Sequence, residues 1–155
     1  VPRGHVRVVG CGFAGLLFVQ ALVRRGDAVS AVDPLPERVE LARSYGAGEP
    51  TAPVTAAVLC AHAGLDGALA GLEPGGTLLL FSWLTEPARV DLEAVLRREL
   101  TIVGSCSATP AAMREAVVLL PALDPIPTVA LPLARFGEGL ELYRRHEAVK
   151  VVYAP

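Results

Sequence analysis

Long uninterrupted hydrophobic runs are missing from this sequence, although its hydrophobic content is high. Hydrophobic residues make up 52% of the 155 residues, and the mean hydropathy is +0.47. Charged residues, glycine or proline interrupt every run before the roughly 18 apolar residues that a membrane-spanning helix needs. We therefore expect no membrane association, and a core of buried strands that read as short apolar runs.

An excess of basic residues is also missing, and cysteines are few. Fourteen Lys and Arg stand against 16 Asp and Glu, and the basic residues are scattered, so no nucleic-acid partner is expected. Cys11, Cys60 and Cys106 are odd in number, lie far apart and form no Cys-x-x-Cys pair, which argues against a disulfide framework or an internal zinc site. Reduced cysteines and the lack of a visible signal peptide favour a cytoplasmic location.

The most informative feature that is present is a glycine-rich turn between an apolar strand at residues 6–9 and a helical segment at 16–25. A helix amino terminus presents unpaired N–H groups and a positive dipole end, which favour a phosphate. In the Gly-x-Gly-x-x-Gly pattern the first glycine permits the turn, the second admits a pyrophosphate, and the third lets the helix approach the strand. The predicted cradle comprises Gly10, Cys11, Gly12, Phe13, Ala14 and Gly15.

An acidic residue follows the next strand, which we expect at residues 28–32. Asp33 can accept hydrogen bonds from the 2′- and 3′-hydroxyls of an adenosine ribose, and it would repel a 2′-phosphate. NAD is therefore favoured over NADP. The alternative is that Asp33 only opens the turn at Pro34 and caps a helix that begins at Pro36.

Strands and helices alternate along the rest of the chain, which predicts an α/β fold: a Rossmann-type doubly wound parallel sheet with helices on both faces. Further strands are expected at residues 54–60, 77–81 and 100–104, helices at 36–45, 65–72, 91–98 and 111–120, a loop at 47–53 and a turn at 74–76. We expect one domain over residues 1–155. Residues 122–155 form a less regular tail with a helix at 137–145 and a strand at 149–153.

The order and spacing of five segments resemble the nucleotide-binding domain of the medium-chain dehydrogenase/reductase family, the zinc-type alcohol, sorbitol and threonine dehydrogenases. The segments are residues 9–17 (VGCGFAGLL), 31–47 (AVDPLPERVELARSYGA), 72–80 (LEPGGTLLL), 98–105 (RELTIVGS) and 148–153 (AVKVVY). The resemblance implies binding of NAD(H), for hydride transfer between a secondary alcohol or polyol and the nicotinamide ring.

The resemblance also implies positions for further cofactor contacts. Arg38 would lie beside the adenosine ribose, or else be a solvated helix charge. The strand ends would contribute the other contacts: Cys60, Ala61 and His62 on the adenine side through their backbone, Phe81, Ser82 and Trp83 near the nicotinamide ribose, and Ser105 near the carboxamide. Relatives have small residues where Ser82 and Trp83 stand, so Trp83 either narrows the nicotinamide end or meets another domain.

Members of this family also carry a catalytic domain that supplies zinc ligands, a proton relay and most of the substrate pocket. The three histidines, His5, His62 and His146, are too dispersed to replace it. We expect the chain to be the cofactor-binding part of such an enzyme, excised or truncated, with any zinc confined to the absent domain. In the family the region from 136 to 153 returns to that domain.

The resemblance further implies a homodimer, because the strand that matches Thr101–Gly104 lies at the sheet edge and pairs with its copy. An uncharged apolar edge is a suitable template for such pairing. Two other functions stay open. A nucleotide-sensing regulatory module would lack catalysis, and an S-adenosylmethionine-dependent methyltransferase would require an acid where Val8 stands.

Overall fold

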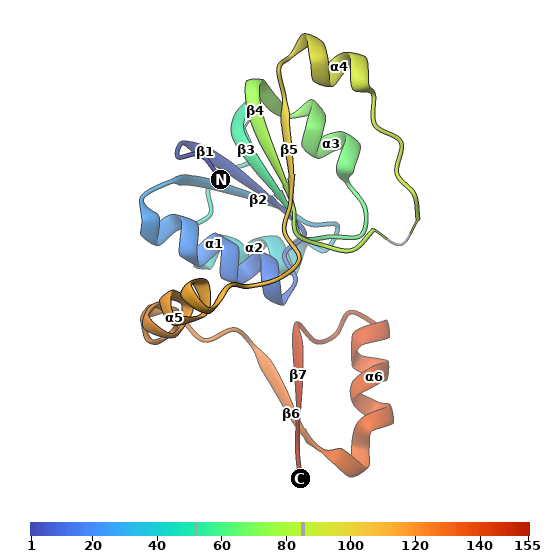
Figure 1. Cartoon of the computed structure of the whole chain (residues 1–155). Coiled ribbons are helices and arrows are strands. Elements are labelled where there is room, and N and C mark those ends of the chain that lie inside the picture. Colours follow the sequence, from blue (N-terminus) through green and yellow to red (C-terminus); the bar gives the residue numbers. More distant parts are fainter. Residues whose placement is uncertain (52, 85) are drawn as a thin grey trace. The chain divides into compact units, whose positions relative to one another are not determined.

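The structure is a computed structural model that describes residues 1–51, 53–84 and 86–155, so one residue of the expected 47–53 loop lies outside it. It divides into two compact units, Val1–Leu123 and Asp124–Pro155 (Figure 1). The first unit carries the larger sheet, and the second is a small motif with a sheet of its own.

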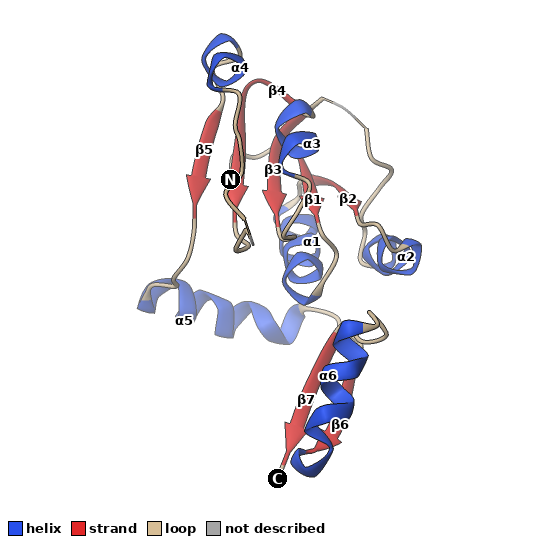
Figure 2. Ribbon diagram, turned by 90° about the vertical axis from the view of Figure 1, so that its right-hand side faces the viewer, coloured by secondary structure: helices blue, strands red, loops and turns tan. Residues whose placement is uncertain are grey.

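The first unit contains a parallel sheet of five strands in the order β2-β1-β3-β4-β5. The strands are β1 (His5–Val9), β2 (Ala28–Val32), β3 (Val54–Leu59), β4 (Leu72–Leu80) and β5 (Thr101–Gly104). Their arrows point the same way, so all carboxyl ends meet at one edge (Figure 2). The predicted Rossmann-type fold is confirmed.

Helices cover both faces of this sheet. They are α1 (Phe13–Arg25), α2 (Pro36–Ser44), α3 (Leu65–Ala70), α4 (Leu92–Arg97) and α5 (Pro110–Leu119), with a 3-10 turn η1 (Leu120–Ala122). The chain moves outward from β1 to β2 and in the opposite direction from β3 to β4. Right-handed crossovers therefore place α1 and α3 on opposite faces, as Figure 1 shows. The reversal of direction between β1 and β3 is where such sheets bind ligands.

The central strands of the sheet are almost completely buried. Val6 and Val8 of β1 are fully buried, and so are five of the six residues of β3, which are Val54, Ala56, Ala57, Val58 and Leu59. Burial on both faces explains why these strands read as apolar runs rather than as alternating patterns. The hydrophobic composition is thus a consequence of the two-sided sheet.

Two expected boundaries are different in the structure. Strand β4 begins at Leu72 rather than at residue 77, and the expected turn at 74–76 is a bulge within it, where the pairing with β3 shifts register. Gly75, with φ of +78°, donates its N–H to the carbonyl of Arg98 there. In the expected loop between α2 and β3 the described residues form one isolated parallel bridge, from Gly48 to Ser30.

The second unit is a βαβ motif of β6 (Thr128–Pro132), a 3-10 turn η2 (Leu133–Arg135), α6 (Phe136–Arg144) and β7 (Lys150–Ala154). Strand β6, which pairs in parallel with β7, was not predicted because prolines flank it. Tyr153 donates its hydroxyl to the carbonyl of Phe136, and only glycine fits at Gly139, where a Cβ would lie 2.1 Å from that hydroxyl oxygen.

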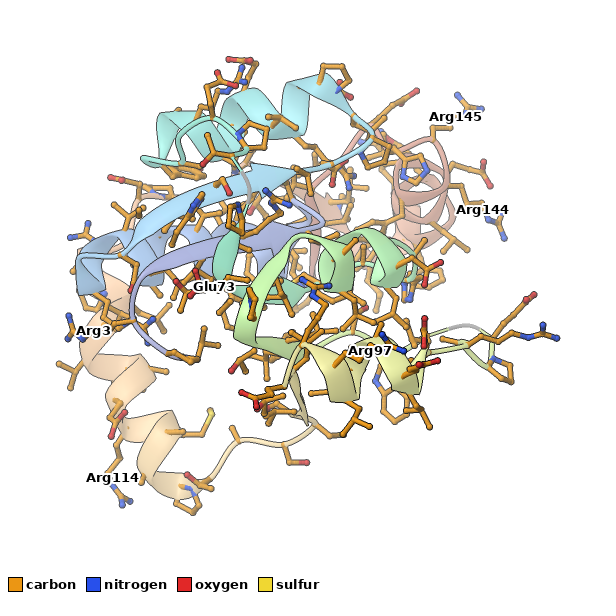
Figure 3. The ribbon with its side chains drawn as sticks, turned by 90° about the horizontal axis from the view of Figure 1, so that it is seen from above. Arg3, Glu73, Arg97, Arg114, Arg144 and Arg145 are labelled. Carbon is orange, nitrogen blue, oxygen red and sulfur yellow. The ribbon has the colours of Figure 1, made fainter. Side chains whose placement is uncertain are left out.

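Charged side chains are distributed around the molecule rather than gathered in one stripe. Figure 3 labels Arg3, which precedes β1, Arg97 on α4 and Arg114 on α5. One carboxylate, that of Asp27, is buried. The side chain of Asp27 is 1% exposed, accepts the N–H of Gly4 at 3.1 Å, and pairs with Arg25 at 2.5 Å. It joins the end of α1 to the segment that enters β1.

We predict that Asp27→Asn lowers the free energy of unfolding at neutral pH by about 1–2 kcal/mol, because the N–H groups of Gly4 and Arg25 lose a charged acceptor. The hydrogen bond from Arg25 is the main cause that holds the pKa of Asp27 below its ordinary value. Its stabilising contribution is therefore complete above that ordinary value and is lost as the pH falls toward the lowered one. Urea denaturation at pH 7 and at pH 3 measures this, with the exposed Glu115→Gln as control. An equal deficit of the Asp27 variant at both pH values would contradict it.

Candidate functional site

The turn between β1 and α1 has two glycines that the protein itself requires. Gly10 has φ of +93° and donates its N–H to the carbonyl of Val32 at 2.8 Å, and a Cβ added to it would lie only 2.8 Å from the Cβ of Ala61. At Gly15 a Cβ would lie 1.8 Å from the carbonyl oxygen of Gly10. These two glycines therefore let the first turn of α1 lie directly against the end of β1.

Gly12 is different, because none of the described residues requires a glycine there. Its φ of −72° and ψ of −173° suit any residue, and a Cβ would meet no atom within 4 Å. Gly12 is the N-cap of α1, yet no side chain caps the helix and no acidic residue stands in its first turn. The positive end of a 13-residue helix thus faces open space, an arrangement that suits a bound anion.

Asp33 lies directly beside this turn. One carboxylate oxygen accepts the N–H of Cys11 at 2.7 Å, and the other accepts the N–H of Leu35 at 3.0 Å. The carboxylate therefore opens the turn that leads to α2 and also lies next to the glycines. A carboxylate has about four acceptor positions, so ribose hydroxyls can bind to the remaining ones.

Arg38 of α2 is close enough to the same turn to act on it electrostatically. Its positive charge opposes the rise in the pKa of the Cys11 thiol, which reaches about 12 because of burial and the negative charge of Asp33. Arg38 is half-buried. Its proximity to the glycine turn fits the position beside a ribose better than that of a fully solvated charge, and its contact with a cofactor stays a prediction.

The other half of the site is a hollow of about 440 Å³ at the ends of β4 and β5. The structure brings two predicted segments together there, and its lining comprises Leu80, Phe81, Ser82, Trp83, Leu84, Gly104, Ser105 and Cys106. Backbone N–H groups of Phe81 and Ser82 bind the carbonyl of Leu59, and that of Ser105 binds the carbonyl of Leu80. The walls of the hollow are therefore formed by the segments that follow β4 and β5.

Two of the residues predicted to contact the cofactor make contacts within the protein. Ala61 packs against Gly10 and so supports the glycine turn. His62, expected to act through its backbone, donates Nδ1–H to the carbonyl oxygen of Trp83 at 2.5 Å. Sequence reasoning missed this link, since no spacing pattern signals a contact between loops 21 residues apart. It also missed the ring of Phe18, which lies edge-on to Phe81 with centroids 4.9 Å apart.

No group of three or more His, Cys, Asp or Glu residues that could hold a metal ion occurs among the described residues. His5 bonds to the hydroxyl of Ser30, and His146 lies beyond α6 in the second unit. In the described ranges no helix is both long and apolar enough to span a bilayer.

Solved structures similar to this chain include two alcohol dehydrogenases. The alcohol dehydrogenase TADH from Thermus sp. ATN1 has a TM-score of 0.89 and 26% identity over 99% of this chain and 52% of its own. A thermostable alcohol dehydrogenase from Pyrobaculum aerophilum has a TM-score of 0.88 and 25% identity over 99% and 51%. The predicted resemblance to zinc-type medium-chain dehydrogenases is confirmed.

Other comparisons limit how far this resemblance extends. Acetophenone reductase from Geotrichum candidum NBRC 4597, solved with NAD, has a TM-score of 0.81 but only 20% identity, over 97% of this chain and 48% of its own, and so supports the fold alone. No protein-family model and no curated protein matches the sequence. The chain spans about half the length of the dehydrogenases it resembles.

The three cysteines should differ sharply in reactivity. Burial raises the pKa of Cys60 to about 12, as it does for Cys11, whereas Cys106 is exposed. Because the thiolate is the reactive form, we predict that iodoacetamide at pH 8 modifies Cys106 alone in the folded chain and all three after denaturation. Peptide mass spectrometry identifies the sites. Modification of Cys11 or Cys60 before Cys106 would contradict the burial of these two thiols.

Proposed function

We propose that this chain is the NAD(H)-binding domain of an alcohol dehydrogenase-like oxidoreductase that transfers hydride between a secondary alcohol or polyol and nicotinamide. The observation that carries the proposal is the open space at Gly12, which neither backbone geometry nor packing explains. A pyrophosphate placed there would meet the positive end of α1. Bound NAD would supply the hydride acceptor, and the chain would hold and orient it.

Different residues of the chain would bind different parts of the cofactor. The backbone at Gly10–Gly15 would hold the pyrophosphate, Asp33 and Arg38 the adenosine ribose, and the β4–β5 hollow the nicotinamide end. The negative charge of Asp33 disfavours a 2′-phosphate, so NAD is proposed over NADP. The described residues do not fit a zinc site, and zinc and the substrate pocket are assigned to a catalytic domain outside this chain.

The second unit supports the same proposal. A sheet of two strands is marginal by itself in water, and Val152 of β7 is exposed although α6 covers the core of the motif. We propose that this unit packs against the catalytic domain in the whole enzyme. A cytoplasmic location also stays a prediction. No specific observation favours a nucleotide sensor or a methyltransferase over this function.

Calorimetric titration tests the cofactor. We predict saturable binding of NADH and at least tenfold weaker binding of NADPH. Gly12→Ala should weaken NADH by more than tenfold with little change in melting temperature, because its Cβ fills space meant for the pyrophosphate. Gly67→Ala in α3, also in open space, is the matched control and should leave binding unchanged. Absence of saturable NADH binding up to millimolar concentration rejects the proposal, and preferred binding of S-adenosylmethionine would replace it.

We also propose a homodimer through β5, which lies at the edge of the sheet and exposes Val103. Wild-type chain at micromolar concentration should scatter light as a dimer. Val103→Lys should shift it toward monomer, because a lysine would place its charge in the paired edge. Val152→Lys makes the same change on a similarly exposed strand residue and should not do so. A monomeric wild type would contradict the dimer.

A further inference from the structure

The most exposed aromatic side chain in the described structure lies at the rim of the β4–β5 hollow. Trp83 is 78% exposed and is the only tryptophan of the chain. A free indole would expose a large apolar surface, of the order of 200 Å². Trp83 adjoins Phe81, which is 42% exposed, so the two rings form an aromatic rim on the hollow.

The main chain of this residue is nevertheless held in place. Its carbonyl oxygen accepts the Nδ1–H of His62, so the loop after β4 is tied to the loop after β3. The neighbouring Phe81 is anchored in turn by the edge-on ring of Phe18. The indole therefore projects from a fixed backbone.

The chemistry of the hollow indicates what covers the indole. No acidic or basic side chain is among the described residues that line it. Its side-chain polar groups are the hydroxyls of Ser82 and Ser105, the thiol of Cys106 and the indole N–H of Trp83. A volume of about 440 Å³ lies within the range of about 300–1,000 Å³ that is usual for small-molecule sites. A flat ring with one uncharged amide group suits such a lining.

The position in the sheet agrees with this chemistry. Asp33 follows β2 on one side of the glycine turn, whereas β4 and β5 lie on the other side of β1. With strands about 4.8 Å apart, β4 and β5 are roughly 10 and 14 Å from β1. A dinucleotide whose adenosine lies at Asp33 and whose pyrophosphate lies at Gly12 would extend its other ring into the hollow.

We propose that the indole of Trp83 stacks on the nicotinamide ring, and that His62 is a positioning residue that holds Trp83 for this contact. The inference rests on the proposed function and deepens it. Trp83 belongs to the cofactor site in this proposal, and not to an interface with the catalytic domain. His62 acts only through the backbone of Trp83.

Titration with two ligands separates this inference from the proposed function. NADH carries the nicotinamide ring, while ADP-ribose carries only the part that would bind at Gly12 and Asp33. Trp83→Ala should weaken NADH about tenfold, as expected for loss of a stacking ring, and leave ADP-ribose unchanged. Trp83→Phe should retain most of the affinity. Leu96→Ala, which removes an equally exposed apolar side chain from α4 at 77% exposure, is the control and should affect neither ligand.

The His62 variants test the positioning role. His62→Ala should weaken NADH but not ADP-ribose, and the double variant with Trp83→Ala should be no weaker than Trp83→Ala alone, because the two residues act as one unit. His62→Asn, which can place an N–H donor near the same carbonyl, should restore binding. In the wild type, NADH should quench the fluorescence of the single tryptophan and ADP-ribose should not.

The outcomes are distinct. If neither ligand binds, the proposed function itself fails. If both bind but Trp83→Ala leaves the affinity for NADH unchanged, the stacking inference is wrong and Trp83 is assigned to the interface with the catalytic domain. If Trp83→Ala weakens both ligands equally, the loop has a general structural role and the inference is also overturned.

Discussion

The contact between the first turn of α1 and the end of β1 supports every other feature of the candidate site. A Cβ at Gly15 would lie 1.8 Å from the carbonyl oxygen of Gly10, so α1 can occupy its position only while that residue is glycine. The contact directs the helix amino terminus toward the carboxyl edge of the sheet. It also brings the N–H of Cys11 within 2.7 Å of the Asp33 carboxylate. Gly12 lies between Gly10 and Gly15, two tightly packed glycines, yet a Cβ added to it would meet no described atom within 4 Å.

The site joins two chemically different halves along one edge of the sheet. On the β2 side lie oriented N–H groups, a helix dipole and a carboxylate, which would bind sugar and phosphate in the proposed function. On the β4–β5 side, aromatic and aliphatic side chains provide a hollow with few polar groups. The division follows from the topology, because the chain reverses direction between β1 and β3 and places different strand ends on either side.

Much of the fold was predictable because the strongest signals are local. The apolar strands are buried on both faces, and Thr109 caps α5 with Pro110 in its first turn, a local combination that favours a helix start. The failures also have local causes. The Pro-Gly-Gly segment of β4 has the composition of a turn but forms a bulge, because Leu72 pairs with Val54 of the neighbouring strand. Strand β6 was missed because prolines flank it, although parallel pairing with β7 stabilises it.

The sequence by itself determined the glycine turn between β1 and α1, the acid after the second strand and the alternation of strands and helices, since each depends on residues that are close in the chain or regularly spaced. It also carried the resemblance to dehydrogenases. Only the tertiary structure decided that Gly12 faces open space while Gly10 and Gly15 do not, and that the ring of His62 holds Trp83. Those relations arise between segments that folding brings together, and no sequence period encodes the distance between two loops.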